Sequence, residues 1–171
     1  AGRRLQCREA LALLGPLPFF HSFGMLTMNV AVRIAGKMVP IPNPRDLHLV
    51  LDEMAKEKPT FVPGVPRLFD ALNESPLTAK FDLRSVKACI SGAAPLPTAV
   101  AERFAEITGG AKLVEGYGLT ECTSACTVNR PGATRYGTVG QALPGFEIRI
   151  AEDGEVLLRS DTVFAGYYED P

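Results

Sequence analysis

The sequence has almost no net charge and no long hydrophobic run, and each shortage excludes a class of protein. Its 171 residues carry a formal net charge of -1 at pH 7, so no bulk electrostatic attraction to nucleic acid or to an anionic membrane is expected. The longest nearly apolar stretch, 23–32, is interrupted by Thr27 and Asn29. It is far shorter than the roughly 20 residues that a membrane-spanning helix needs. Neither a nucleic-acid-binding protein nor a transmembrane protein is indicated.

Cysteine and histidine are also too few, or too badly spaced, for a disulfide or zinc scaffold. The four cysteines are Cys7, Cys89, Cys122 and Cys126. Cys122 and Cys126 are four residues apart, and no histidine or second cysteine pair completes a zinc pattern. We therefore expect four reduced thiols and a cytoplasmic protein.

What is present is the composition of an ordinary globular domain. Hydrophobic residues make up 46% and charged residues 22% of a chain long enough for one domain with a real core. The first residues, Ala1 to Arg4, do not resemble the start of a domain. We expect the chain to be a fragment of a longer protein.

Strand-like and helix-like patterns alternate along the first two thirds of the chain. Strands are expected at 10–17, 37–42, 60–62, 86–90 and 111–114, and helices at 23–35, 46–58, 67–73 and 98–108. This alternation predicts an α/β fold with a mostly parallel sheet flanked by helices. Helix 23–35 is apolar nearly all round, so we expect it to be buried, with Ser22 as its N-cap and Gly36 at its C-terminal cap.

The pattern changes after Glu121, where helices disappear. Apolar and polar residues alternate from Phe146 to Ile150, and Asp153-Gly154 is typical of a hairpin turn. The tail from about Val139 is therefore predicted to be a small antiparallel β unit. We divide the chain into an α/β subdomain, 1–138, and an incomplete β-rich segment of the same large domain, 139–171.

The segment 115–121, EGYGLTE, combines residue types that suit a nucleotide. Its glycines permit close backbone approach, and Tyr117 offers a flat face for a base. Thr120 can donate to a phosphate oxygen, and Glu121 is a hard oxygen ligand suited to Mg²⁺. These residues predict a nucleotide site at a strand end. The alternative is a plain strand, a tight turn and the first turn of a helix.

Two other segments also leave strands, one from His21 and one from Ser91. In parallel sheets, ligands bind beyond the carboxyl ends of the strands. We expect these segments and the one from Gly116 to converge on a single crevice. The alternative for His21, which lies between apolar residues, is a satisfied core histidine.

Together, five segments resemble the motifs of the adenylate-forming acyl-CoA synthetases, nearest the bacterial long-chain fatty-acid-CoA ligases. In chain order they are 18–24 (PFFHSFG), 91–96 (SGAAPL), 117–121 (YGLTE), 154–156 (GEV) and 166–171 (GYYEDP). One such motif is weak evidence, but five in the same order and spacing cover nearly the whole chain.

The resemblance implies ATP-dependent activation of a fatty acid to an acyl-adenylate, followed by transfer to coenzyme A, with Mg²⁺ as cofactor. It implies that His21, Thr120 and Glu121 serve catalysis and that Glu121 holds the metal. The cofactor-binding residues that it implies are Gly92, Ala93, Ala94, Glu115, Gly116, Tyr117, Gly118, Leu119 and Thr120. Peripheral membrane contact and self-association of the whole protein are further expectations.

Several parts of the family pattern are not in this sequence. The phosphate loop would precede Ala1, and the ribose-binding aspartate, the hinge and the lysine-bearing C-terminal domain would follow Pro171. Ala142, Ser160 and Asp161 also depart from the family's usual residues, at turns. We therefore expect the 171-residue chain to be inactive by itself. Two alternatives stay open: a non-catalytic nucleotide-binding module, and a family member acting on an aryl or shorter-chain acid.

Overall fold

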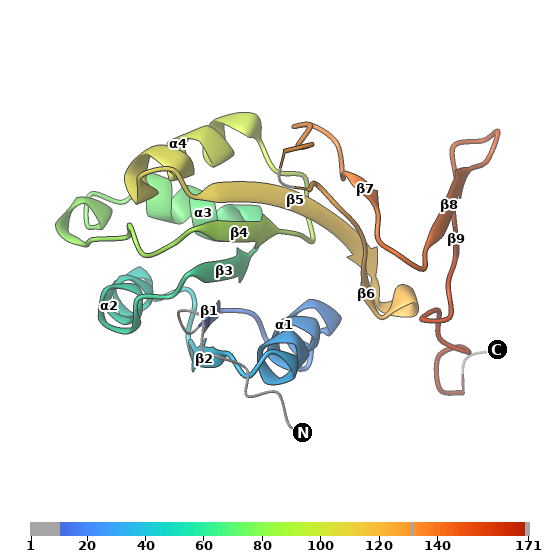
Figure 1. Cartoon of the computed structure of the whole chain (residues 1–171), viewed down its shortest axis with the longest axis horizontal. Coiled ribbons are helices and arrows are strands. Elements are labelled where there is room, and N and C mark those ends of the chain that lie inside the picture. The colour runs from blue at the N-terminus through green and yellow to red at the C-terminus, as the bar shows by residue number, and fades with distance from the viewer. Residues whose placement is uncertain (1–10, 131, 170–171) are drawn as a thin grey trace, which may run out of the picture.

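A seven-stranded sheet forms the centre of the computed structural model, which describes residues 11–130 and 132–169. The strand order is β2-β1-β3-β4-β5-β6-β7, as Figure 1 shows. The first five strands are parallel and comprise β1 (Ala12–Gly15), β2 (Lys37–Pro40), β3 (Phe61–Gly64), β4 (Ala88–Ser91) and β5 (Lys112–Leu119). The predicted mostly parallel sheet is confirmed, although Ala10, the first residue of an expected strand, lies outside the described residues.

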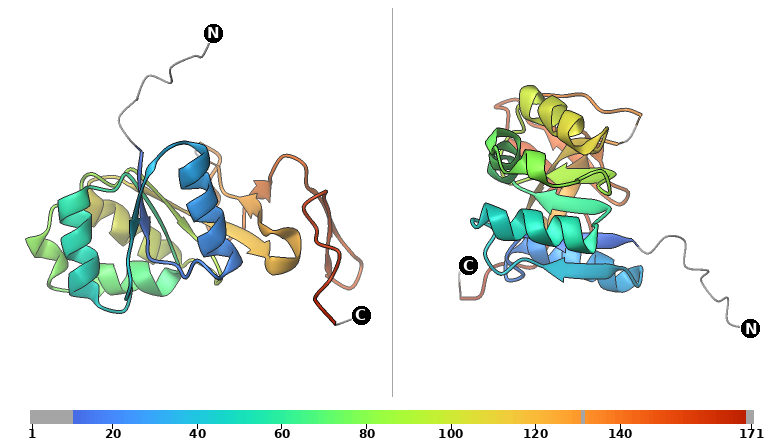
Figure 2. Two further views of the ribbon diagram at one scale, coloured as in Figure 1. Left: turned by 90° about the horizontal axis from the view of Figure 1, so that it is seen from below. Right: turned by 90° about the vertical axis from the view of Figure 1, so that its left-hand side faces the viewer.

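Four helices cover the two faces of this sheet unequally. They are α1 (Ser22–Arg33), α2 (Leu47–Glu57), α3 (Pro66–Glu74) and α4 (Thr98–Thr108), and a 3₁₀ turn, η1, spans Thr78–Lys80. Figure 2 shows α1 on one face and the other three helices on the opposite face. Right-handed crossovers explain this, because the chain moves one way along the sheet from β1 to β2 and the other way from β2 onward.

The main core lies between the sheet and helices α2, α3 and α4. Phe69 and Phe104 meet edge to face there, with ring centroids 5.1 Å apart. Helix α2 is amphipathic as predicted: Val50, Leu51 and Met54 are buried. Its N-cap is Asp46, whose side chain accepts from the backbone N–H of Leu49 at 3.2 Å.

Helix α1 is not buried, contrary to the prediction. Only Gly24, Thr27 and Ala31 are buried, whereas Val32 is 76% exposed. The apolar residues Met25, Val30 and Ile34 are exposed as well. The physical reason is its position: within the described ranges, α1 is the only helix on its face, so nothing there packs against its outer side.

Both caps of α1 also differ from the prediction. The N-cap is His21 rather than Ser22, and its Nδ1 atom accepts from the backbone N–H of Phe23 at 3.2 Å. At the other end, Ala35 takes the left-handed conformation with φ 52°, and Gly36 lies one residue further on. The Gly36 N–H then reaches the carbonyl of Ala31 at 2.8 Å, which closes the helix end.

The 115–121 segment is mostly strand rather than a turn. Strand β5 runs to Leu119 and is followed by a single 3₁₀ turn, η2 (Thr120–Cys122). The chain then returns antiparallel to β5 as β6 (Ser124–Val128), a strand that the sequence interpretation missed. The nucleotide motif is therefore carried by the outer half of a long, paired strand.

The tail contains the predicted antiparallel strands, but they belong to two sheets. Strand β7 (Gln141–Ala142) pairs with β6 in the large sheet. Strands β8 (Glu147–Ile150) and β9 (Val156–Arg159) form a separate hairpin, with Gly154 at φ 90° in its turn. The hairpin stands apart from the parallel strands in Figure 1. The division at 138/139 stays a prediction.

Two smaller expectations concern the membrane and the cysteines. None of the helices in residues 11–130 and 132–169 is both long and apolar enough to cross a bilayer. Cys89, Cys122 and Cys126 are free and buried, while Cys7 lies outside the described residues.

Candidate functional site

Four segments of the sequence line one small cavity of about 60 Å³. One segment follows β1, one includes the end of β4 and the loop after it, and the third lies in the outer half of β5, so the three segments converge as the strand-end argument predicted. The fourth lies at the start of β6. The lining residues are His21, Ser22, Phe23, Ile90, Gly92, Ala93, Gly116, Tyr117, Gly118, Ser124 and Ala125. The structure thus brings together six of the predicted site residues: His21, Gly92, Ala93, Gly116, Tyr117 and Gly118.

The glycines of β5 allow its neighbours to come unusually close. A Cβ at Gly118 would lie 1.5 Å from the carbonyl oxygen of Ser124, and one at Gly116 would lie 2.9 Å from Cδ1 of Ile90. The β5–β6 register also shifts between Tyr117 and Gly118, and such irregularities often re-aim side chains beside functional sites. Close strand approach is therefore the reason for glycine on both sides of Tyr117.

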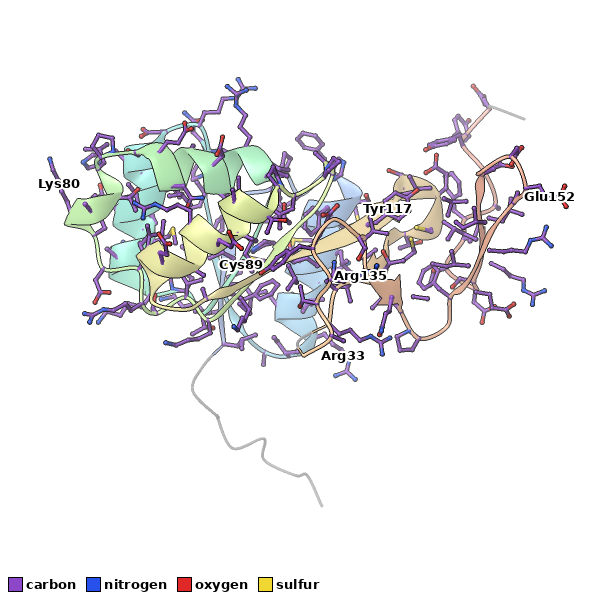
Figure 3. The ribbon with its side chains drawn as sticks, turned by 90° about the horizontal axis from the view of Figure 1, so that it is seen from above. Arg33, Lys80, Cys89, Tyr117, Arg135 and Glu152 are labelled. Carbon is purple, nitrogen blue, oxygen red and sulfur yellow. The ribbon has the colours of Figure 1, made fainter. Side chains whose placement is uncertain are left out.

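Tyr117 contributes the aromatic face of the cavity. Figure 3 shows it on β5, on the side of the molecule away from Lys80. Its ring is partly buried, and burial raises the pKa of its phenol above the usual value. The hydroxyl therefore stays protonated at neutral pH and is available as a hydrogen-bond donor.

The loop after β4 adopts a strained conformation beside the cavity. Ala93 has φ 67°, which is uncommon for a residue with a side chain. A Cβ at the preceding Gly92 would lie 3.1 Å from the Phe23 ring. Ala94 is exposed and does not line the cavity. Strain of this kind clusters at functional sites.

Glu115 holds that loop in place instead of facing the cavity. Its Oε2 atom accepts from the backbone N–H of Leu96 at 3.1 Å, and its own carbonyl accepts from the N–H of Asn129 at 2.9 Å. Glu115 therefore links β5 both to the 91–97 loop and to the end of β6. Its contribution to the site, in the structure, is to support the loop that carries Gly92 and Ala93.

His21 lies at the rim of the cavity and is exposed. The interpretation of His21 as a core histidine is therefore wrong. Its Nδ1 atom is occupied in capping α1, so the residue both starts that helix and borders the cavity.

Thr120 and Glu121 follow the cavity-lining part of β5 but do not line the cavity themselves; nor does Leu119. Glu121 Oε1 accepts from the hydroxyl of Tyr167 at 2.8 Å. Its own backbone N–H, and then the Tyr167 hydroxyl, lower the pKa of the Glu121 carboxyl. The carboxylate is therefore ionised at neutral pH.

The residues around Glu121 fit one mode of Mg²⁺ binding, in which the protein supplies only part of the ligands. In the part of the chain that the structure describes, no three His, Cys, Asp or Glu side chains are grouped as an all-protein metal cage. Mg²⁺ is commonly held by one or two carboxylates together with water and substrate phosphates. The ionised Glu121, with the Thr120 hydroxyl next to it, fits that mode.

The cavity that gathers the predicted site residues is the smaller of two cavities. A larger cavity of about 810 Å³ lies beside the carboxyl ends of β1 and β3, among Pro16, Leu17, Pro18, Pro44, Arg45, Leu47, Val65, Arg67, Leu68 and Ala71. Its walls are mostly apolar, and only Pro18 belongs to a predicted motif. We place the candidate site at the smaller cavity because six predicted site residues, including the aromatic Tyr117 and the glycines on either side of it, gather there.

The sequence interpretation missed the contribution of β6. Ser124 and Ala125 line the cavity, and in the β5–β6 pairing they lie opposite Leu119 and Gly118. The available signal was the short run 124–128, in which Thr127 and Val128 favour strand, but it is weak because the other residues are small.

An open, mostly parallel α/β sheet with a glycine-lined crevice beyond its strand ends defines a ligand-binding α/β domain. The chain belongs to the AMP-binding enzyme family, which matches residues 2–168. The long-chain-fatty-acid–CoA ligase of Bacillus subtilis (strain 168) is 34% identical over 174 residues, covering 93% of this chain and 30% of that protein.

Solved structures agree with this assignment. The anthranilate CoA ligase AuaEII in complex with anthranoyl-AMP has a TM-score of 0.84 at 27% identity, covering 91% of this chain and 32% of that one. O-succinylbenzoate coenzyme A synthetase (MenE) from Bacillus subtilis, in complex with ATP and magnesium ion, has a TM-score of 0.77 at 22% identity, with coverages of 96% and 36%. The second likeness shows the fold alone. The chain thus spans about a third of the length of these relatives.

Proposed function

We propose that the whole protein is a long-chain fatty-acid-CoA ligase, which activates a fatty acid with ATP and transfers the acyl group to coenzyme A. The observation that carries the proposal is the single cavity that gathers His21, the Gly92-Ala93 loop and the Gly116–Gly118 segment. The Bacillus subtilis relative bears that name, and the AuaEII structure holds an acyl-adenylate, anthranoyl-AMP.

The residues divide the work by their chemistry. Tyr117 stacks on the adenine ring, and the backbone of Gly92 and Ala93 lines the adenine and acyl side, with Ala94 next to them outside the cavity. Thr120 donates to phosphate, while Glu115 and Leu119 support the loop and the turn on either side. His21 borders the path of the attacking carboxylate. No protein nucleophile is needed, because positioning and charge stabilisation carry such a reaction.

Magnesium, held by Glu121, would neutralise negative charge on the triphosphate as the anionic carboxylate approaches. Glu121 suits this role because it is ionised and is the second residue after the strand that carries Tyr117 and Gly118. Coenzyme A enters as the co-substrate of the second step.

A second candidate keeps the family but changes the acid. AuaEII is named for anthranilate, an aryl acid, and matches this chain at 27% identity. The small residues Gly92, Ala93 and Ala125 at the cavity suit a flat ring as well as an alkyl chain. Rates of ATP–pyrophosphate exchange with long-chain, short-chain and aryl acids separate the two candidates.

The decisive experiment measures ATP–pyrophosphate exchange in the whole protein and in Glu121→Gln. Loss of a metal ligand removes charge stabilisation from the transition state, so we expect the rate to fall about 100-fold or more. Glu152→Gln is the matched control, since Glu152 lies in the β8–β9 turn, well away from Tyr117 in Figure 3.

Each outcome has a definite meaning. Exchange that depends on a long-chain acid and is lost in Glu121→Gln alone supports the proposal. Exchange that persists in Glu121→Gln contradicts the metal role, and no exchange with any acid in the unaltered whole protein supports the non-catalytic alternative.

A further inference from the structure

The turn that carries Glu121 is tied to a distant segment near the end of the described chain. Four hydrogen bonds join η2 and the residue after it, Thr123, to the segment 162–167. We call this set of contacts the Glu121 clasp. They run from Phe164 N to Glu121 O (2.9 Å), Thr123 Oγ1 to Thr162 O (2.6 Å), Thr162 Oγ1 to Cys122 O (3.3 Å) and Tyr167 Oη to Glu121 Oε1 (2.8 Å).

We propose that Tyr167 is a positioning residue, whose hydroxyl holds the Glu121 carboxylate in the orientation that accepts Mg²⁺–ATP. The inference rests on the proposed function, because it takes Glu121 as the metal ligand. It adds to that function a residue 46 positions away in the sequence.

The local backbone explains why such a support is needed. Glu121 lies on a single 3₁₀ turn of three residues, directly followed by Thr123 and Ser124 with φ 60° and 98°. A short turn at the surface leaves a glutamate side chain with much rotamer freedom. A ligand that must meet a metal and a phosphate together loses efficiency when its position is not fixed in advance.

The clasp forms a closed ring of contacts around Glu121. The N–H of Phe164 holds the Glu121 carbonyl, the Phe164 ring packs edge to face on Tyr167 at 4.8 Å, and Tyr167 donates to the Glu121 side chain. Backbone and side chain of Glu121 are therefore held by the same short segment. A carboxylate has about four lone-pair sites, so one bond from Tyr167 leaves capacity for a metal.

The neighbouring tyrosine provides a matched control. Tyr168 is 91% exposed, whereas Tyr167 is 51% exposed and contacts Phe164 and Glu121. Tyr167→Phe removes only the hydroxyl and keeps the ring that packs on Phe164. Tyr168→Phe removes the same atom one residue further on.

The test uses the whole protein and two readouts. Calorimetric titration with ATP, without any acid, is performed in Mg²⁺ and in EDTA, and exchange rates are measured over a range of Mg²⁺ concentrations. For Tyr167→Phe we expect ATP affinity to fall about 3- to 10-fold in Mg²⁺, the size of one partly exposed charge-assisted hydrogen bond. In EDTA the affinity should not change.

The Mg²⁺ concentration for half-maximal exchange should rise by a similar factor in Tyr167→Phe, and excess Mg²⁺ should restore the rate. Tyr168→Phe should match the unaltered protein throughout. Tyr167→Phe should have no further effect on ATP affinity when added to Glu121→Gln, because the two residues act through one contact.

Other results of these measurements would contradict the positioning role of Tyr167, the metal role of Glu121, or both. A loss of affinity that is equal in EDTA, or that excess Mg²⁺ does not restore, would show a merely structural role. A lower Mg²⁺ concentration for half-maximal exchange in Tyr167→Phe would contradict the proposal, because it would show that the hydroxyl competes with the metal. No change in Tyr167→Phe, with activity lost in Glu121→Gln, overturns the positioning role alone. Activity kept in Glu121→Gln overturns the proposed metal role and this inference with it.

Discussion

Two regions of the molecule are held together by different forces. The packed region, β1 to β4 with α2, α3 and α4, buries large apolar side chains such as Phe69, Phe104 and Met54 completely. The open region, from Glu115 to the end of the β8–β9 hairpin, buries mainly small or polar residues, among them Cys122, Ser124, Cys126, Thr127 and Asn129. Several of its larger apolar side chains, including Ile150 and Val156, are exposed.

Hydrogen bonds to loop carbonyls replace apolar contacts in the open region. Thr127 Oγ1 donates to the carbonyl of Val139 at 2.7 Å, and Asn129 Nδ2 donates to that of Thr138 at 2.6 Å. A net hydrogen bond contributes only about 1 kcal/mol, less than a large buried side chain. Stability is therefore concentrated in the packed region, while the open region carries most of the candidate chemistry.

The largest effect should come from the packed region. Phe104→Ala should lower the free energy of unfolding by about 3–5 kcal/mol, because it removes a fully buried ring that packs on Phe69. Phe20→Ala removes the same atoms from a side chain that is 90% exposed, and it should change the free energy of unfolding by less than about 0.5 kcal/mol. Chemical denaturation of both variants measures the difference, and similar losses would contradict this division of stability.

A smaller effect, on binding rather than folding, should come from the open region. Tyr117→Ala should weaken ATP binding by about 1–3 kcal/mol, the size of base stacking on an aromatic in nucleic-acid sites, used here by analogy. Tyr136→Ala, another partly exposed tyrosine outside the cavity, is the control. Titration of the whole protein with ATP and with fatty acid checks the prediction. Equal losses for the two ligands would mean that Tyr117 is a packing residue.

The difference between the regions also explains what the sequence could predict. Helix α4 was predicted with its observed bounds, and α2 to within one residue at each end, because their apolar periodicity matches real burial. The apolar pattern of α1 also gave a helix, but not its exposure, since burial depends on what packs against that face. Local pattern therefore predicts an element better than it predicts that element's environment.

The candidate site was predictable in composition but not in geometry. The residue types at Tyr117 and Glu121 led to the predicted nucleotide site, and the strand-end rule predicted that the segments of His21 and Gly92 would meet the one that carries Tyr117. The continuation of β5 to Leu119 was missed because Gly116 and Gly118 favour a turn locally. Strand pairing overrode that preference, since only glycine allows β6 to approach so closely. The contact of Tyr167 with Glu121 spans 46 positions and has no local signal.

The same Val→Thr substitution can be made in both regions, and its effect on stability should differ between them. Val156 in β9 is 41% exposed, and Val62 in β3 is fully buried. Valine and threonine have nearly the same shape and both favour strands, so Val→Thr mainly adds a hydroxyl. In β3 that hydroxyl is removed from water, and we expect a loss of about 1–3 kcal/mol in the free energy of unfolding.

In β9 the hydroxyl stays in contact with water, and we expect a change of less than about 0.5 kcal/mol. Denaturation of the 171-residue chain and of the whole protein measures both variants. Equal losses in the 171-residue chain would refute the division into packed and open regions. A loss for Val156→Thr that appears only in the whole protein would show that another part of that protein covers the hairpin, because the hydroxyl would then be buried as it is in β3.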